Sequence, residues 1–340
     1  MDATPKQIPI WRNVDAALFR EQIAPLGQPA VLKDLVADWP VVEAAKRSPQ
    51  ALADYIAGFA TAQPAAVVTA PAAVKGRFFY SDDLNGFNFV TDKQPLDAIL
   101  AELMRHAADA DPPAIAAQYV DIPSTLPGFD RANGLSLPPP SATPRIWIGN
   151  QVIVAAHFDL FENIACVAGG RRRFTLFPPE QVRNLYVGPM ERTPAGTPIS
   201  MVDFDAPNLT LYPRFEQAMA SAQVADLEPG DAIYIPYLWW HHVRSLEPLN
   251  VLLNYWWNQA DPDVVSPQLL MLLALISLRD LPPAYRQAWR GAFDHWIFQT
   301  DGDPTAHLPP QHRGALGGST PGFLRSARAG LIRALGGQPG

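Results

Sequence analysis

Two histidines and one aspartate, from distant stretches of the chain, have the types and spacing for metal chemistry. His157 and Asp159 form a His-x-Asp triplet, and His241 and His242 follow a tryptophan pair. Two imidazoles and one carboxylate leave coordination positions of a metal open, an arrangement that suits Fe(II) and dioxygen. The triplet alone is weak evidence, since a chain with 7 histidines and 33 acidic residues can contain one by chance. A surface pair or a core histidine is the alternative.

The segment around the triplet is predicted to be a strand. Residues 151–160 (QVIVAAHFDL) are apolar and rich in β-branched side chains. Residues two apart in a strand share a face, so His157 and Asp159 are expected to point the same way. Asn163 would join them if the strand ran on that far. Gly169-Gly170 then predicts a turn.

The returning strand, 171–177 (RRRFTLF), directs one arginine toward the core. Its alternation places Arg172, Phe174 and Leu176 on the inward face. A buried cation is costly unless it meets an anion. Arg172 therefore either pairs with an acidic side chain or holds an anionic ligand. An arginine that reaches back to the surface is the alternative.

The downstream half repeats this pattern of turns and short strands. In 227–245 (LEPGDAIYIPYLWWHHVRS), a turn at 229–231 and a strand at 232–235 precede the histidine pair. Residues 252–257 (LLNYWW) form a further strand with Asn254 and Trp256 on one face. A buried amide needs a partner. Asn254 is either a core amide that bonds the backbone or a donor to a bound carboxylate.

Several motifs in this order resemble those of the JmjC, cupin-like 2-oxoglutarate dioxygenases, and among them the asparaginyl hydroxylases most. The resemblance covers about residues 7–260 and is strongest over 146–257. Its motifs are HFDLFEN (157–163), GRRRFTLFPP (170–179), MVDFD (201–205), PGDAIYIP (229–236), WWHHVRS (239–245) and NYW (254–256).

The resemblance implies a mainly β fold with helical additions. Its core would be a double-stranded β-helix of the jelly-roll, cupin or JmjC type, with C-terminal helices. It implies an enzyme that uses Fe(II), O2 and 2-oxoglutarate, forms succinate and CO2, and hydroxylates a protein or peptide side chain. Demethylation or oxidation of a small molecule needs the same oxidant. A metal-binding cupin of another reaction class, and a binding module with a vestigial triad, are further alternatives.

The resemblance also assigns residues. His157, Asp159 and His241 would bind the metal, with His242 as the alternative third ligand. Relatives carry a threonine where this chain has Val154, and a lysine where it has Arg172, which is not a conservative replacement. The residues matched to the 2-oxoglutarate site are Tyr119, Asn163, Arg172, Asn254 and Trp256. A core aromatic is the alternative for Tyr119.

The composition of the chain indicates which kinds of partner and which cellular compartment to expect. The net charge is −7 and the pI is near 5.5, so the chain lacks the excess of basic residues that is typical of nucleic-acid-binding proteins. No nucleic-acid substrate is therefore expected. The single cysteine, Cys166, allows no internal disulfide and fits a reducing compartment. The longest apolar run, 269–278, is too short to cross a bilayer. We therefore expect a soluble, cytoplasmic protein with no membrane partner.

Four segments are expected along the chain. Residues 1–110 are predicted to form mixed α/β elements packed on the core. Residues 111–260 are predicted to form the catalytic domain, with an insert at about 178–225. Two apolar helices at 267–279 and 283–298 lie within a helical segment, 261–300. The resemblance implies a homodimer through these helices. The tail, 301–340, is expected to be partly disordered, with a short basic helix over 323–335.

Overall fold

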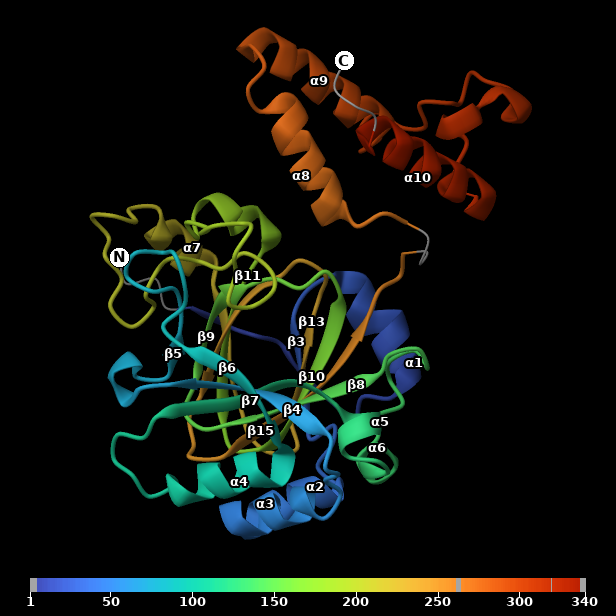
Figure 1. Ribbon diagram of the computed structural model, residues 1–340. Helices are drawn as coiled ribbons and strands as arrows, with labels where there is room; N and C mark the ends of the chain where they lie inside the picture. The colour runs from blue at the N-terminus through green and yellow to red at the C-terminus, as the bar shows by residue number, and fades with distance from the viewer. Residues whose placement is uncertain (1–4, 261–263, 319, 337–340) are drawn as a thin grey trace. The chain divides into compact units, whose positions relative to one another are not determined.

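The computed structural model describes residues 5–260, 264–318 and 320–336 (Figure 1). The chain divides into two compact units, one that extends to Asn258 and one that begins at Gln259. Two sheets form the centre of the first unit. The sheets and their facing inner surfaces correspond to the jelly-roll core expected from the sequence, with helices added around it.

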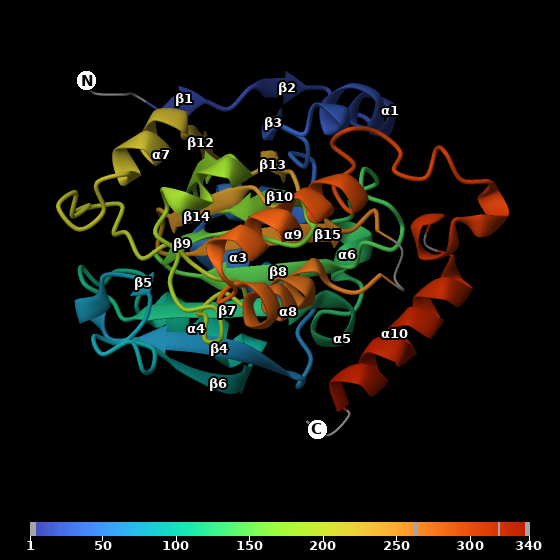
Figure 2. The same ribbon diagram turned by 90° about the horizontal axis from the view of Figure 1, so that it is seen from above.

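The smaller sheet carries the two predicted metal-binding histidines, His157 and His241. Its neighbouring strands run antiparallel, except for the parallel pairs β1–β12 and β5–β9. Figure 2 shows β1 beside β12 at one edge. In spatial order the strands are β1 (Lys6–Gln7), β12 (Gln223–Leu227), β11 (Arg172–Phe177), β14 (Trp240–Ser245), β9 (Ile153–His157) and β5 (Arg77–Phe78).

The larger sheet supplies the opposite wall. All its neighbouring strands are antiparallel except β2 and β3. In spatial order they are β2 (Ile10–Arg12), β3 (Ala30–Lys33), β13 (Ala232–Ile235), β10 (Glu162–Gly169), β15 (Asn250–Trp257), β8 (Pro144–Gly149), β7 (Ala114–Asp121), β4 (Pro64–Ala70) and β6 (Val90–Pro95).

Two apolar layers hold the first unit together. Between the sheets, Phe174 of β11 and Val243 of β14 share one buried cluster with Leu252 of β15. On the outer face of the larger sheet, a second cluster joins the strands to the helices α2, α3 and α4, which Figure 1 shows below β4 and β7. The helices of this unit are α1 (Ala16–Leu18), α2 (Pro40–Arg47), α3 (Pro49–Ala57), α4 (Leu96–Arg105), α5 (Ile122–Thr125), α6 (Phe129–Ala132) and α7 (Phe215–Ser221).

Local signals explain where several of these elements begin. The Ser48 side chain accepts a hydrogen bond from the amide of Ala51, and Pro49 occupies the first turn, as a helix start requires. The predicted strand over 151–160 is shorter in the structure, because β9 ends at His157. Asp159 therefore lies in the connection to β10, and Asn163 lies on β10 rather than on the strand of His157.

The second unit is helical. It contains α8 (Pro267–Leu278), α9 (Pro283–Trp296) and α10 (Pro321–Gly336), which includes the short basic helix predicted in the tail. Pro282 and Pro283 lie where α9 begins, at its N-cap and first helical position. Large apolar side chains of α8 are exposed, namely Leu269, Leu270, Met271, Leu272 and Ile276. Among the described residues, no helix has the length and apolar character needed to cross a bilayer.

Candidate active site

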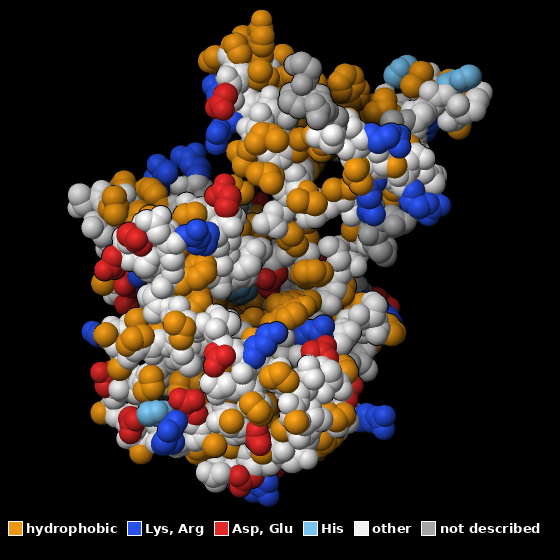
Figure 3. Space-filling model, viewed as in Figure 1, with side chains coloured by type: hydrophobic (Ala, Val, Ile, Leu, Met, Phe, Trp, Pro, Cys, Tyr) orange, Lys and Arg blue, Asp and Glu red, His pale blue; other side chains and the backbone are white. Residues whose placement is uncertain are grey.

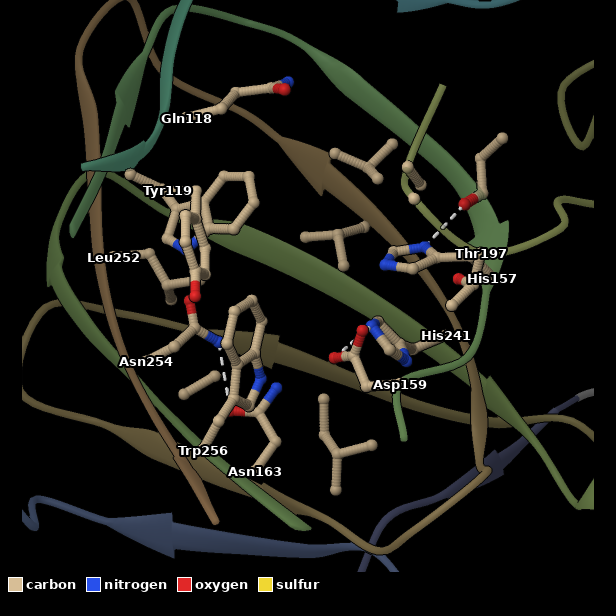
Figure 4. A pocket seen from close by; sticks show the side chains of 18 of the residues that line it. Gln118, Tyr119, His157, Asp159, Asn163, Thr197, His241, Leu252, Asn254 and Trp256 are labelled. Carbon is tan, nitrogen blue, oxygen red and sulfur yellow. Dashed lines mark hydrogen bonds and ion pairs between the residues drawn. The ribbon is translucent and has the colours of Figure 1, made fainter. Parts of the chain in front are cut away.

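The three predicted ligands come together at one end of the space between the sheets. His241 of β14 pairs directly with His157, the last residue of β9, and Asp159 follows two residues later. One ligand atom from each residue lies within 4.8 Å of the other two, and His241 Nε2 is 3.6 Å from Asp159 Oδ2. Figure 4 shows the three side chains converging. Residues 84 positions apart in the chain are thus brought into one cluster by a single antiparallel pairing.

Both histidines present the nitrogen that a metal needs. Nδ1 of His157 lies 2.9 Å from the carbonyl oxygen of Ala155, and Nδ1 of His241 lies 3.1 Å from that of Trp239. A carbonyl only accepts, so each Nδ1 carries a proton, and in a neutral ring Nε2 then keeps its lone pair for a metal. Burial, helped by the nearby His241, lowers the pKa of His157 to about 4. His157 is therefore neutral at pH 7, the form that ligates metals.

Asp159 provides a test of whether a metal fits this site. Its Oδ2 is buried and accepts no hydrogen bond from the described residues. Leaving a buried acceptor unpaired costs about 1–3 kcal/mol, and more when the group is charged. A divalent cation next to Oδ2 would remove that cost. Two imidazole nitrogens and one carboxylate, in a cluster that faces a cavity, suit Fe(II) with open positions.

His242 has a different environment from its neighbour. It lies on the opposite face of β14, where its ring stacks on Phe204 with centroids 4.4 Å apart and planes 13° from parallel. The side chain is buried, and that burial lowers its pKa to about 3. His242 is not among the described residues that line the cavity. The geometry therefore selects His241 over His242 as the third member of the cluster.

The cluster opens onto a cavity of about 420 Å³ between the sheets. Figure 3 shows a hollow on this face of the first unit, with hydrophobic side chains around it. Besides the cluster, the cavity is lined by Phe78, Gln118, Tyr119, Trp147, Val154, Ala155, Leu160, Phe161, Asn163, Ala165, Arg172, Phe174, Pro194, Ala195, Gly196, Thr197, Ile199, Ile235, Val243, Leu252, Asn254 and Trp256.

Arg172 is a buried cation without a counterion among the described residues. The side chain begins β11, lines the cavity and is 5% exposed, which excludes the surface alternative. Its Nε has no hydrogen-bond partner, and no described carboxylate forms an ion pair with it. Burial lowers its pKa to about 10, below the usual range of a guanidinium, so the group stays charged at neutral pH. Of the alternatives from the sequence, neither an acidic partner nor a surface position is found for Arg172 among the described residues.

Asn163 and Asn254 bond to each other rather than to the backbone. Asn254 Nδ2 donates to Asn163 Oδ1 at 3.0 Å, across the adjacent strands β10 and β15. Asn254 Oδ1 is buried and has no partner in the described part of the chain. Both side chains line the cavity (Figure 4). The pair therefore holds each amide in one orientation, with polar atoms left over for a ligand.

Tyr119 is held by an irregularity in β7. The pairing with β8 shifts register between Ala117 and Val120, and Tyr119 has a φ of 53°. Such bulges turn a side chain out of the strand's regular alternation. The residue is 54% exposed, so the core alternative is wrong. It stacks on Trp256 with centroids 5.5 Å apart, and both rings line the cavity.

Sequence reasoning missed two parts of the lining. One is the loop 194–197 in the insert, where Thr197 Oγ1 donates to the Phe158 carbonyl at 2.7 Å. No periodic pattern marks that loop. The other is Trp147 of β8. The alternation in RIWIG gives a usable signal for it, because Ile146 and Ile148 occupy the opposite, buried face.

Comparisons with known proteins agree with this geometry. The family model described as Cupin-like domain matches residues 16–263. The tRNA wybutosine-synthesizing protein 5 of Danio rerio is 26% identical over 325 residues, which cover 84% of this chain and 90% of that protein. Lysine-specific demethylase JMJ31 of Arabidopsis thaliana is 39% identical over 104 residues, and HSPB1-associated protein 1 of Mus musculus is 34% identical over 115. These two alignments cover only 18% and 23% of the relatives' own lengths.

Proposed function

Because the chain belongs to the cupin-like domain family, we propose that it is an Fe(II)- and 2-oxoglutarate-dependent oxygenase. One observation carries the proposal. The same apolar cavity contains a cluster of two imidazoles and a carboxylate, and an unpaired buried arginine. The cluster fits a divalent metal with open positions, and the arginine fits the far carboxylate of a dicarboxylic keto acid.

Each group of residues has a separate task in this proposal. His157, Asp159 and His241 would hold the iron through Nε2, a carboxylate oxygen and Nε2. When bound, iron of this kind couples the oxidative decarboxylation of 2-oxoglutarate by O2, which gives succinate and CO2, to the oxidation of a substrate C–H bond. Arg172 neutralises the far carboxylate. A planar guanidinium can hold a carboxylate through two parallel hydrogen bonds.

The remaining walls orient the co-substrate and limit water. Asn163 and Asn254, fixed by their mutual hydrogen bond, offer amide groups in the same cavity as the three proposed ligands. The lining is otherwise largely apolar, with Phe174, Val243 and Leu252 between the two sheets. A dry site strengthens the electrostatic interactions within it and protects reactive groups from water.

For the substrate, we propose a protein or peptide side chain that becomes hydroxylated. The motif resemblance to asparaginyl hydroxylases supports this choice. The named relatives include a lysine demethylase and a tRNA-modifying protein, so demethylation is the main competing outcome. The two are separable by product, because oxidation of an N-methyl group releases formaldehyde and hydroxylation of a side chain adds one oxygen.

The test is conversion of 2-oxoglutarate to succinate with Fe(II) present, measured in wild-type protein and in two neighbouring variants. His241→Ala removes a proposed ligand and is expected to abolish both conversion and tight metal binding. His242→Ala removes a buried ring that faces away from the cavity. The folded His242→Ala variant is expected to retain both 2-oxoglutarate conversion and tight metal binding. Equal loss in the two variants, or no Fe(II)-dependent conversion by wild type with a broad substrate panel, would contradict the proposal.

We also propose that the second unit mediates a homodimer. The α8 surface is apolar on several sides, and Leu269, Met271 and Ile276 are each more than half exposed. A helix that is apolar around its circumference must be covered by another surface. The motif resemblance supports a second copy of this chain as that surface.

A further inference from the structure

Trp147 carries a polar hydrogen that no described residue accepts. It lines the cavity from β8, and its indole Nε1 is buried without a hydrogen-bond partner. An indole nitrogen is a donor only. Leaving a donor buried and unpaired destabilises a protein, and native structures rarely do so without a reason. A ligand that accepts this hydrogen bond would provide the reason.

The position of Trp147 suggests which part of a ligand it meets. Trp147 pairs with Leu252 across β8 and β15 and packs on the cluster that contains Leu252 and Phe174. Phe174 is two residues from Arg172 on the same face of β11, and all four side chains line the cavity. The indole thus belongs to the stretch of the larger sheet that faces the strand of Arg172. Its ring centroid is also 6.4 Å from that of Tyr119.

Two lining residues of the smaller sheet offer no hydrogen-bond donor. Val154 of β9 pairs with Val243 of β14, and both line the cavity with hydrocarbon only. A carboxylate has two oxygens with about four acceptor sites. A guanidinium fills part of that capacity, and an indole N–H from the facing sheet can fill a further site.

We propose that Trp147 is a positioning residue for 2-oxoglutarate, whose far carboxylate accepts a hydrogen bond from the indole N–H while Arg172 neutralises its charge. The inference rests on the proposed function and adds a residue to it. It explains how a carboxylate is held where Val154 contributes no hydroxyl. This hydrogen bond would also make the site bind dicarboxylic keto acids more tightly than monocarboxylic ones.

The first test is calorimetry on Zn(II)-loaded protein with two ligands. 2-Oxovalerate shares the keto acid end of 2-oxoglutarate but carries a methyl group in place of the far carboxylate. Trp147→Phe keeps an aromatic ring and removes the N–H. It is expected to weaken 2-oxoglutarate binding by about tenfold or more, as for a hydrogen bond to a charged group, and to leave 2-oxovalerate binding within about twofold.

Two further variants sharpen this measurement. Trp257→Phe, on β15 but outside the described cavity lining, is the matched control and is expected to bind both ligands as wild type does. Val154→Thr, combined with Trp147→Phe, places a hydroxyl in the same stretch of the cavity. It is expected to restore part of the affinity for 2-oxoglutarate and none for 2-oxovalerate.

A second readout is measured on wild-type protein, and a variant is used only to assign one signal. The chain has 9 tryptophans, and ¹⁵N labelling gives one indole N–H signal for each. On Zn(II)-loaded wild type, one such proton is expected to move downfield with 2-oxoglutarate and not with 2-oxovalerate. The signal that disappears in Trp147→Phe identifies it.

The outcomes separate the two claims. If wild type binds 2-oxoglutarate but no indole signal responds to the far carboxylate, or Trp147→Phe binds it with wild-type affinity, the role of Trp147 is refuted and the proposed function stands. If wild type binds neither keto acid, the proposed function itself is refuted.

Discussion

Replacing Arg172 with methionine is expected to make the ligand-free protein more stable and the ligand-bound protein less so. The guanidinium is buried, and burial lowers its pKa to about 10, below the usual range of the group. Since one pKa unit corresponds to about 1.4 kcal/mol, burying the charge has an unfavourable free energy on the order of 3 kcal/mol. Because the folded pKa lies below the unfolded one, the cost is present in full below about pH 10 and fades as the pH rises toward the pKa of a free guanidinium.

Methionine has a similar length and no charge, so Arg172→Met removes this cost at neutral pH. The free energy of unfolding of the ligand-free protein is expected to rise by up to about 3 kcal/mol, less any loss from imperfect packing. In the opposite direction, 2-oxoglutarate affinity is expected to fall by roughly 10- to 100-fold, since hydrogen bonds to charged groups contribute about 1.5–3 kcal/mol.

The assay is urea denaturation with and without 2-oxoglutarate on Zn(II)-loaded protein. Arg173→Met is the matched control, because Arg173 is exposed on the opposite face of β11 and pairs with Asp226 at 2.7 Å. Its effect on unfolding is expected to stay within about 1 kcal/mol, with no change in ligand affinity. The reasoning is refuted if Arg172→Met destabilises the ligand-free protein by several kcal/mol, or binds 2-oxoglutarate as wild type does.

Two other predictions concern stability and assembly. Asp231 is buried and accepts hydrogen bonds from Lys33 Nζ, at 2.8 Å, and from two backbone amides. Asp231→Ala is therefore expected to lower the free energy of unfolding by about 3–5 kcal/mol in urea denaturation. A decrease of less than about 1 kcal/mol would show that these bonds contribute little to stability. Ile276→Glu, on the exposed face of α8, is expected to convert a dimer to a monomer in analytical ultracentrifugation, whereas Arg290→Glu on α9 serves as a surface control. A monomeric wild type at tens of micromolar would contradict the dimer.

The site residues that follow strict strand alternation could be predicted from the sequence. Arg172 and Trp256 both line the cavity from predicted strands, because alternation needs only local information. The pairing of His157 with His241 could not be predicted from alternation alone, because no local pattern indicates that β9 and β14 are neighbours. Ordered motifs shared with a family supplied that long-range information.

Other features depended on tertiary context. The choice between His241 and His242 is set by the register of β14 against β9 and β11, and one step of slippage would exchange the two rings. The position of Tyr119 depends on a bulge that no residue pattern marked. The end of β9 at His157 was also unpredicted, because residues 158–160 remain apolar or compatible with a strand.

The most direct test of the central claim is a crystal structure with Mn(II) and N-oxalylglycine, an unreactive analogue of 2-oxoglutarate. We expect the metal on Nε2 of His157, Nε2 of His241 and a carboxylate oxygen of Asp159, with the analogue chelating its open positions. The far carboxylate is expected to lie against Arg172. A metal bound elsewhere, or a far carboxylate directed away from Arg172, would contradict the account.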